Sequence, residues 1–193
     1  MPAMTQTAPA EARYTSQAYF NLVETGDLHA DDSVELLEGV IIAMSPKNPR
    51  HASATTRVDT ALRQAVAGRA VVRVQLPMIT GAYSVPEPDV AVVPGRDSDY
   101  DDAHPTAALL VVEIADSSLL QDRLTKAAIY AAAGIAQYWL VNLRDDCIEV
   151  FSAPNMGARS YAERRIARRG ECLGLAALPG SSVEVDDMLP TGR

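Results

Sequence analysis

Two acidic residues interrupt apolar segments at positions where a carboxylate is costly. Asp89 lies in "PEPDVAVV", residues 86–93, and Glu113 lies in "ALLVVEIA", residues 108–115. Both segments are rich in Val, Leu and Ala, as strands covered on both faces are. A carboxylate buried in such a strand needs a partner charge or a metal ion. Asp89 and Glu113 are therefore either members of structural ion pairs or ligands of a metal.

A lysine and a third acid are available to complete such a site. Lys126 is one of only two lysines and lies in "SSLLQDRLTKAAIYAAAG", residues 117–134, which has the pattern of a helix. On that helix Asp122, Lys126 and Tyr130 are spaced four residues apart and share one face. Glu35 precedes the next predicted strand after the first helix.

Carboxylates and an ammonium group in this combination suit metal-assisted hydrolysis of a phosphodiester. Mg²⁺ takes oxygen ligands, usually one or two carboxylates together with water and substrate phosphate. A bound metal polarises the phosphoryl group and lowers the pKa of a bound water, and a nearby ammonium offsets the charge that develops on the phosphate. We expect Asp89 and Glu113 to bind Mg²⁺, or Mn²⁺ in its place, with Glu35 and Lys126 assisting.

Each of these residues also has a structural explanation that the sequence leaves open. Asp89 could be a turn residue before a strand, and Glu113 could form an ion pair with Lys126 or an arginine. Lys126 could pair with Asp122 on a solvent-exposed face of the helix. Glu35 could belong to a solvated acidic segment.

Helices and strands alternate along the chain in an order that must position these residues. Helical patterns cover residues 15–24, 51–68 and 117–134, and strand patterns cover residues 38–45, 70–78, 89–94, 108–115, 137–143 and 147–152. The tripeptide "RDD" joins the last two strands as a hairpin, and residues 172–189 are expected to form short strands and turns. This order predicts an α/β (α+β) fold in which helices pack on a mixed central sheet.

The bulk properties bound the remaining possibilities. A chain of 193 residues with 48% hydrophobic residues suits one domain, predicted over residues 14–193 after a flexible arm over residues 1–13. No apolar run is long enough to span a membrane, and no secretory signal is recognisable. Cys147 and Cys172 form no metal-binding motif, and a cytoplasmic setting is expected.

The charge distribution is uneven. A net charge of −8 argues against nonspecific nucleic-acid binding by the whole surface. Basic residues nevertheless gather in two segments, residues 47–73 and residues 159–169, "RSYAERRIARR". The second of these segments is either a solvated face or a surface that meets phosphates.

The ordered set of motifs resembles a known family. "ELLEGVIIAMSP" (35–46), "PEPDVAVV" (86–93) and "LVVEIADSS…DRLTKAAIYAAAGIAQYWLVN" (110–142) are similar to the bacterial Uma-type family of candidate endonucleases. That family belongs to the PD-(D/E)xK, restriction-endonuclease-like superfamily, and the resemblance covers nearly the whole chain. It implies a mixed central sheet flanked by helices and a Mg²⁺-dependent nuclease site at one sheet edge. It also implies DNA as the substrate and a homodimer, since two sites cut two strands.

The resemblance also assigns residues. It places Asp89 at the aspartate of the Pro-Asp element, Glu113 at the acidic position of the next strand and Glu35 at the glutamate that follows the first helix. His51 matches a histidine after the "SP" turn. The lysine of the superfamily pattern, two residues after Glu113, is absent because Ala115 stands there. The resemblance implies that Lys126 replaces it from the following helix.

The leading hypothesis is therefore a Mg²⁺-dependent endonuclease acting on DNA. The main alternative is a catalytically weak or inactive nucleic-acid-binding or assembly module of the same fold, and a third is hydrolysis of another nucleic acid such as structured RNA. A saturable Mg²⁺ or Mn²⁺ site at the carboxylates would separate an enzyme from an inert module.

Overall fold

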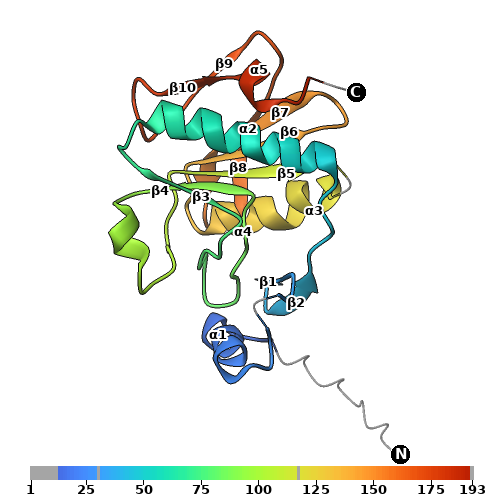
Figure 1. Ribbon diagram of the computed structural model, residues 1–193, viewed down its shortest axis with the longest axis vertical. Helices are drawn as coiled ribbons and strands as arrows, with labels where there is room; N and C mark the ends of the chain where they lie inside the picture. Colours follow the sequence, from blue (N-terminus) through green and yellow to red (C-terminus); the bar gives the residue numbers. More distant parts are fainter. Residues whose placement is uncertain (1–12, 30, 117, 192–193) are drawn as a thin grey trace, which may run out of the picture.

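A six-stranded mixed sheet forms the centre of the computed structural model, which describes residues 13–29, 31–116 and 118–191 (Figure 1). Its strands, in spatial order, are β3 (Val71–Val74), β4 (Val90–Val93), β5 (Leu110–Ala115), β6 (Gln137–Asn142), β7 (Cys147–Asn155) and β8 (Ser160–Ala167). Only β5 and β6 pair in parallel, and every other neighbouring pair in this sheet is antiparallel. The mixed central sheet is confirmed. The predicted arm lies outside the described residues except for Arg13.

Helices cover both faces of the sheet, because alternate residues of its central strands are apolar on both sides. Val112 and Ile114 of β5 belong to the core under α2 (Pro49–Val66), whereas Val111 and Ala115 belong to the core under the helix that follows β5. That helix comprises α3 (Leu119–Gln121), the π-helical turn η2 (Asp122–Lys126) and α4 (Ala127–Ala132). The strands β9 (Cys172–Gly174) and β10 (Ser182–Glu184) and the helix α5 (Val185–Met188) complete the α2 side (Figure 1).

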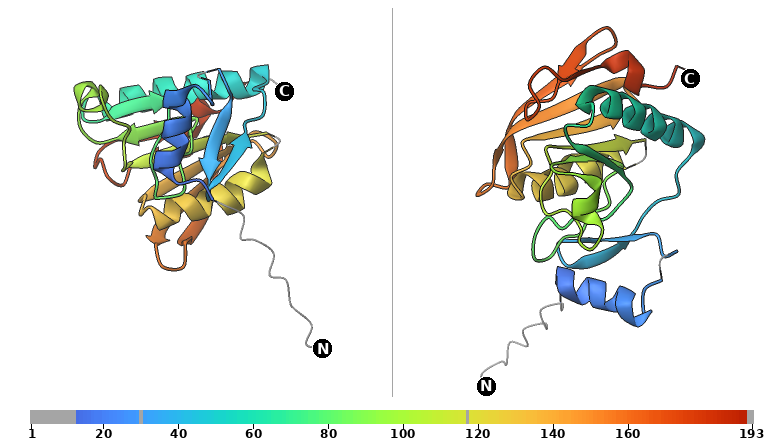
Figure 2. Two further views of the ribbon diagram at one scale, coloured as in Figure 1. Left: turned by 90° about the horizontal axis from the view of Figure 1, so that it is seen from below. Right: turned by 60° about the vertical axis from the view of Figure 1, so that its left-hand side comes forward.

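A small N-terminal unit lies at one end of the molecule (Figure 2). It consists of α1 (Ser16–Thr25) and the hairpin of β1 (Val34–Leu37) and β2 (Val40–Ala43). The two-residue turn of the hairpin has φ of 54° at Glu38 and 84° at Gly39, and a left-handed pair of this kind favours glycine. The predicted strand over 38–45 is therefore wrong at its start, and Glu35 lies inside a strand instead of before one.

The edge strand β8 is the main element that the sequence pattern missed. Most residues of β8 are exposed, and its apolar residues do not alternate regularly with polar ones. The strand contains Arg164 and Arg165, and Arg159 directly precedes it. β8 is therefore a strand because it pairs with β7. The short helix η1 (Asp97–Tyr100) was also not predicted. Within the described part of the chain, no helix combines the length and apolar character needed to cross a membrane.

Candidate functional site

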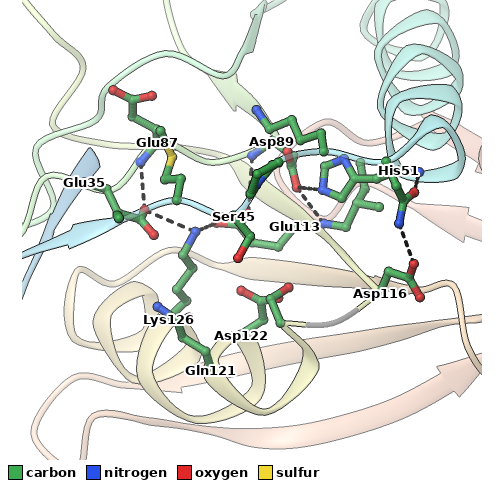
Figure 3. Close-up of a pocket in the computed structure, with 17 residues that line it drawn as sticks. Glu35, Ser45, His51, Glu87, Asp89, Glu113, Asp116, Gln121, Asp122 and Lys126 are labelled. Carbon is green, nitrogen blue, oxygen red and sulfur yellow. Dashed lines mark hydrogen bonds and ion pairs between the residues drawn. The ribbon is translucent and has the colours of Figure 1, made fainter. Parts of the chain in front are cut away.

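Four residues selected from the sequence meet in one pocket beside the end of β5 (Figure 3). Glu35 comes from β1, Asp89 directly precedes β4, Glu113 lies in β5 and Lys126 ends η2. All four are buried, with at most 7% of each residue exposed. The hairpin β1–β2 is what brings Glu35 to this place, since it packs across the entrance to β4 through the bridge between Leu36 and Val85.

Asp89 directly precedes β4 and Glu113 lies in the neighbouring antiparallel strand β5, so the two residues are side by side, as their spacing suggested. The main-chain N–H of Asp89 donates to Oε2 of Glu113 over 3.4 Å, and Oδ2 of Asp89 accepts the N–H of Ile114 over 2.9 Å. These contacts hold both carboxylates at one end of the two strands. Asp89 is therefore more than a turn residue before a strand.

Lys126 points from the helix to a position between two carboxylates (Figure 3). Its Nζ lies 3.1 Å from Oε1 of Glu113 and 3.2 Å from Oε2 of Glu35. The interpretation of Lys126 and Asp122 as a pair on a solvent-exposed face is wrong, because both residues are buried. The ammonium of Lys126 thus reaches the end of β5 from the neighbouring helix. The strand itself has no cation there, because Ala115 stands where the superfamily pattern has a lysine.

A π-helical turn presents Lys126 to the site. The N–H of Ala127 donates to the carbonyl of Asp122, and the hydroxyl of Tyr138 donates to the same carbonyl over 3.2 Å. Arg123, in the same turn, donates from Nε and Nη2 to the fully buried carboxylate of Glu149 on β7. π-helical turns are rare in proteins overall, and a large share of those that occur lie at functional sites. Two strands therefore anchor the turn that carries Lys126.

Replacing Arg123 by alanine is expected to lower the free energy of unfolding by about 1–3 kcal/mol, since it leaves a buried charged acceptor with fewer donors. Arg164 and Asn142 still donate to Glu149 and limit the loss. Urea denaturation measures the change. Arg165→Ala is the control, because that exposed residue pairs at the surface and should cost less than about 1 kcal/mol. Equal losses in the two variants would contradict the anchoring role.

His51 lies against Asp89 at the start of α2. Its Nε2 is 3.1 Å from Oδ2 of Asp89. Asn48 fixes the start of the helix by accepting the N–H of His51 over 2.9 Å and by donating to Asp116, just after β5, over 2.7 Å. The histidine that the resemblance selected therefore belongs to the pocket, as a partner of Asp89.

Three residues of the pocket region were missed as members of the site. Tyr130 is fully buried in the core and also donates its hydroxyl to Oε1 of Glu113 over 2.6 Å. The main-chain N–H of Glu87 donates to Glu35 over 3.3 Å. Asp122 lines the pocket. The four-residue spacing of Tyr130 from Lys126 was the available signal for the tyrosine, and Glu87 stands two residues before Asp89.

A family model described as "Putative restriction endonuclease" and named Uma2 matches residues 17–186. The chain belongs to the Uma2 family. This membership confirms the resemblance inferred from the motifs and supports a nuclease-like function. No curated protein sequence matches the chain.

One solved structure shows that the fold recurs outside this chain. It is a "putative nuclease belonging to DUF820" from Anabaena variabilis, with a TM-score of 0.68 and 17% sequence identity. The match covers 86% of this Uma2 chain and 96% of the other. At that identity the likeness shows the fold alone, which is the mixed sheet with flanking helices.

The charge state of the Uma2 pocket follows from its excess of carboxylates. Burial raises the pKa of Glu113 to about 8, against the lowering effect of Lys126. Burial also raises the pKa of Asp122 to about 6. Burial opposes the charge of Lys126, but Glu113, Glu35 and Asp122 outweigh it and raise its pKa. Without a metal the pocket therefore keeps its ammonium and retains a proton on Glu113 near neutral pH.

Asp89 differs in this respect from Glu113 and Asp122. Burial favours its protonated form, but the hydrogen bond from His51 and the N–H of Ile114 outweigh that effect and hold its pKa below the ordinary value. Asp89 thus stays ionised more readily than Glu113 or Asp122.

The metal-free protein is expected to lose stability as the pH rises from 6 to 8. Folded Glu113, with a pKa near 8, keeps a proton that the unfolded chain has released above its ordinary pKa, so the folded state binds more protons in this window. One proton corresponds to a slope of at most about −1.4 kcal/mol per pH unit. Urea denaturation in EDTA at pH 6, 7 and 8 measures this slope.

Glu113→Gln is the informative comparison for this titration. Glu113→Gln should reduce the decline of the unfolding free energy between pH 6 and 8, whereas Glu163→Gln, at an exposed position, should not. All variants contain the same histidines, so the histidine contributions cancel when the variants are compared. An identical slope in the wild type and in Glu113→Gln would contradict the raised pKa of Glu113.

The donor set of the pocket fits Mg²⁺ better than a transition metal. In the described ranges of the chain, no three His, Cys, Asp or Glu side chains gather as a complete metal-binding group. Asp89 and Glu113 would offer two oxygen ligands, and Mg²⁺ is commonly bound by one or two carboxylates with water and phosphate in the remaining positions. Zn²⁺ sites, by contrast, use three or four protein ligands, mainly His and Cys.

Proposed function

We propose that this Uma2 protein is a Mg²⁺-dependent endonuclease that hydrolyses phosphodiester bonds of DNA. The observation that carries the proposal is the contact of Lys126 with Glu113 in a buried pocket that also holds Asp89. Two carboxylates from adjacent strands and one ammonium are the groups that metal-assisted phosphodiester hydrolysis needs. Membership of the Uma2 family supports the same class of reaction.

Each residue has a distinct part in the proposed mechanism. Asp89 and Glu113 would hold Mg²⁺, which supplies polarisation of the phosphoryl group and a bound water of lowered pKa. Lys126 donates hydrogen bonds to the attacking water and offsets negative charge on the phosphate. Tyr130 orients Glu113 by donating to Oε1, and Glu35 holds the ammonium from the side opposite Glu113.

Cleavage of supercoiled plasmid and of single-stranded DNA in Mg²⁺ or Mn²⁺ tests the function. We expect metal-dependent products from the wild type, none in EDTA, and a large loss in Asp89→Asn. Asp102→Asn is the matched control, because Asp102 is an exposed aspartate in the loop before β5 and the substitution changes charge equally. Absence of cleavage by the wild type in either metal would contradict the proposal.

The same experiment addresses the alternative of a weak or inactive module. That alternative is favoured by the net charge of −8, which disfavours binding of a polyanion by the general surface. Saturable metal binding and DNA binding without cleavage would support it. Cleavage of structured RNA alone would identify a ribonuclease. A homodimer is part of the proposal only for double-strand cleavage, and the sedimentation coefficient of the active protein tests it.

A further inference from the structure

A hollow lined by arginines lies beside the pocket, between the start of α2 and the β6–β7 turn. Its cationic residues are Arg50 on α2, Arg144 in the β6–β7 turn and Arg169 after β8. Pro190 and Thr191, near the end of the chain, line it as well. Figure 1 shows the start of α2 and the loop after β6 on the same side of the molecule as α3.

Two of these arginines form no ion pair with the acids that also line the hollow, Asp145 and Asp146. Arg169 pairs with Asp146, and Asp145 accepts a hydrogen bond from the neutral amide of Asn142 over 2.8 Å, which leaves its charge in place. Arg50 and Arg144, by contrast, form no ion pair with any residue in the described part of the chain. Neither guanidinium is therefore paired with a carboxylate of the described residues, and Arg144 is exposed.

The guanidinium of Arg50 also lacks a hydrogen-bond partner at one of its nitrogens within the described part of the chain. Its Nε is buried and has no hydrogen-bond partner among the described residues. A buried donor without a partner costs free energy, more so when the group is charged. Such groups in folded proteins call for a bound water or ion, and a guanidinium is shaped for two parallel hydrogen bonds to a phosphate.

The arginines of the β8 region behave differently. Arg159 pairs with Glu38, Arg164 with Glu149 and Arg165 with Glu171. These acids already offset the charge that made residues 159–169 a candidate for phosphate contact. Of the five arginines in the second basic segment, four therefore form ion pairs, Arg169 among them.

The hollow and the pocket share one edge of the sheet. Arg50 directly precedes His51, which contacts Asp89, and one step along a helix rotates a side chain by about 100°, so Arg50 lies beside the pocket and not in it. β6 runs parallel to β5. Arg144, just past the end of β6, is therefore at the same sheet edge as Asp116, just past the end of β5.

We propose that Arg50 and Arg144 bind phosphate groups of the nucleic-acid backbone next to the one that is cleaved. This inference rests on the proposed nuclease function and locates the path of the substrate on the protein. The pocket is rich in carboxylates and the protein carries a net charge of −8, so a polyanion needs local cations to approach it. Contacts to phosphates set the position of the strand and carry no sequence information.

Binding of a fluorescein-labelled duplex tests the inference in EDTA, measured by anisotropy from 50 to 200 mM salt. The double variant Arg50→Ala/Arg144→Ala should bind about tenfold more weakly, and the slope of log K against log salt should fall by about 1.8 for two lost phosphate contacts. The matched control is Arg159→Ala/Arg165→Ala, which removes the same charge from paired arginines. It should change affinity less than threefold and leave the slope near that of the wild type.

Cleavage kinetics supply a second measurement. In Mg²⁺ the Arg50→Ala/Arg144→Ala variant should show a raised KM with kcat within about threefold of the wild type. The variant loses contacts that stabilise the bound substrate and the transition state equally, and its catalytic residues are unchanged. Arg50→Lys/Arg144→Lys should recover most of the salt slope, since charge is retained, but less of the affinity, since the bidentate geometry is lost.

The outcomes separate this inference from the proposed function. A wild type that cleaves DNA together with a double variant of unchanged affinity and slope would overturn the arginine contacts and leave the nuclease function intact. Equal weakening of both double variants would also overturn them, as a general charge effect. A wild type that neither binds nor cleaves DNA would overturn the proposed function, and the inference with it.

Discussion

Lys126→Ala is expected to lower the rate of DNA cleavage on the order of 10²-fold or more, by analogy with the loss of other electrostatic or acid–base groups. Its ammonium lies 3.1 Å from Glu113 and 3.2 Å from Glu35, where it can steer a water and offset charge on the phosphate. Single-turnover cleavage in saturating Mg²⁺ measures the effect. DNA binding should weaken only slightly, because one cation is a small share of the phosphate contacts.

The burial of Lys126 also gives the substitution a cost in stability. Removing the ammonium leaves Glu113 and Glu35 without their common hydrogen-bond donor in a buried pocket, and a buried acceptor without its partner costs about 1–3 kcal/mol. Mg²⁺ should recover part of this loss, since it replaces the missing positive charge. Lys126→Met keeps most of the side-chain volume and separates the loss of charge from the loss of packing.

Two further variants sharpen the interpretation. Lys126→Arg should not restore cleavage, because the planar guanidinium has a different shape and rarely gives up a proton. Lys47→Ala removes the other lysine, an exposed residue at the pocket rim, and should retain most of the cleavage rate. If the folded Lys126→Met variant cleaves DNA at a rate within about twofold of the wild type, Lys126 does not position the attacking water. His51 would then be the next candidate for that role.

Asp89→Asn is expected to abolish the stabilisation of the protein by Mg²⁺ or Mn²⁺. A ligand present at 100 times its dissociation constant stabilises the native state by about 2.7 kcal/mol, which corresponds to a rise in Tm of about 5–10 °C for a chain of this size. The substituted amide retains an oxygen for the N–H of Ile114 but brings no negative charge to the metal. The variant should therefore fold, lose the metal-dependent rise and lose cleavage by about 10²-fold or more.

Calorimetry with and without metal measures both the Tm shift and its saturation. Glu113→Gln should reduce the response as well, because the ion would lose its second carboxylate. Asp102→Asn should respond as the wild type does. A Tm shift of the same size in wild type and Asp89→Asn would remove Asp89 from the set of metal ligands.

Local sequence patterns were sufficient to predict the central elements and the main acidic residues. The continuous apolar segments around Asp89 and Glu113 predicted two buried neighbouring strands, and β4 and β5 confirm that prediction. The apolar periodicity of residues 51–68 and 117–134 predicted the helices on the two faces. These patterns are readable because a buried strand or helix must have apolar side chains in contact with its neighbours. The metal-binding roles of Asp89 and Glu113 stay predictions.

The partners of the site residues, by contrast, depend on the tertiary structure. The hairpin β1–β2 brings Glu35 to Lys126 across 91 positions of the chain, and a π-helical turn aims Lys126 at Glu113. Neither contact leaves a periodic signal, because single long-range pairs depend on how the strand ends meet. β8 was missed for the same reason, since an exposed edge strand is stabilised by its neighbour and not by its own apolar pattern.

Charge shows the same division between sequence and structure. The composition alone establishes that the protein is acidic and that its basic residues gather in two segments. Which arginines remain unpaired depends on the carboxylates that the fold places near them, and these come from distant parts of the chain, as Glu38 does for Arg159. Linear patterns therefore specify the strands, the helices and the candidate carboxylates. Which side chains meet depends on the fold, because those contacts arise where separate elements end at a common edge of the sheet.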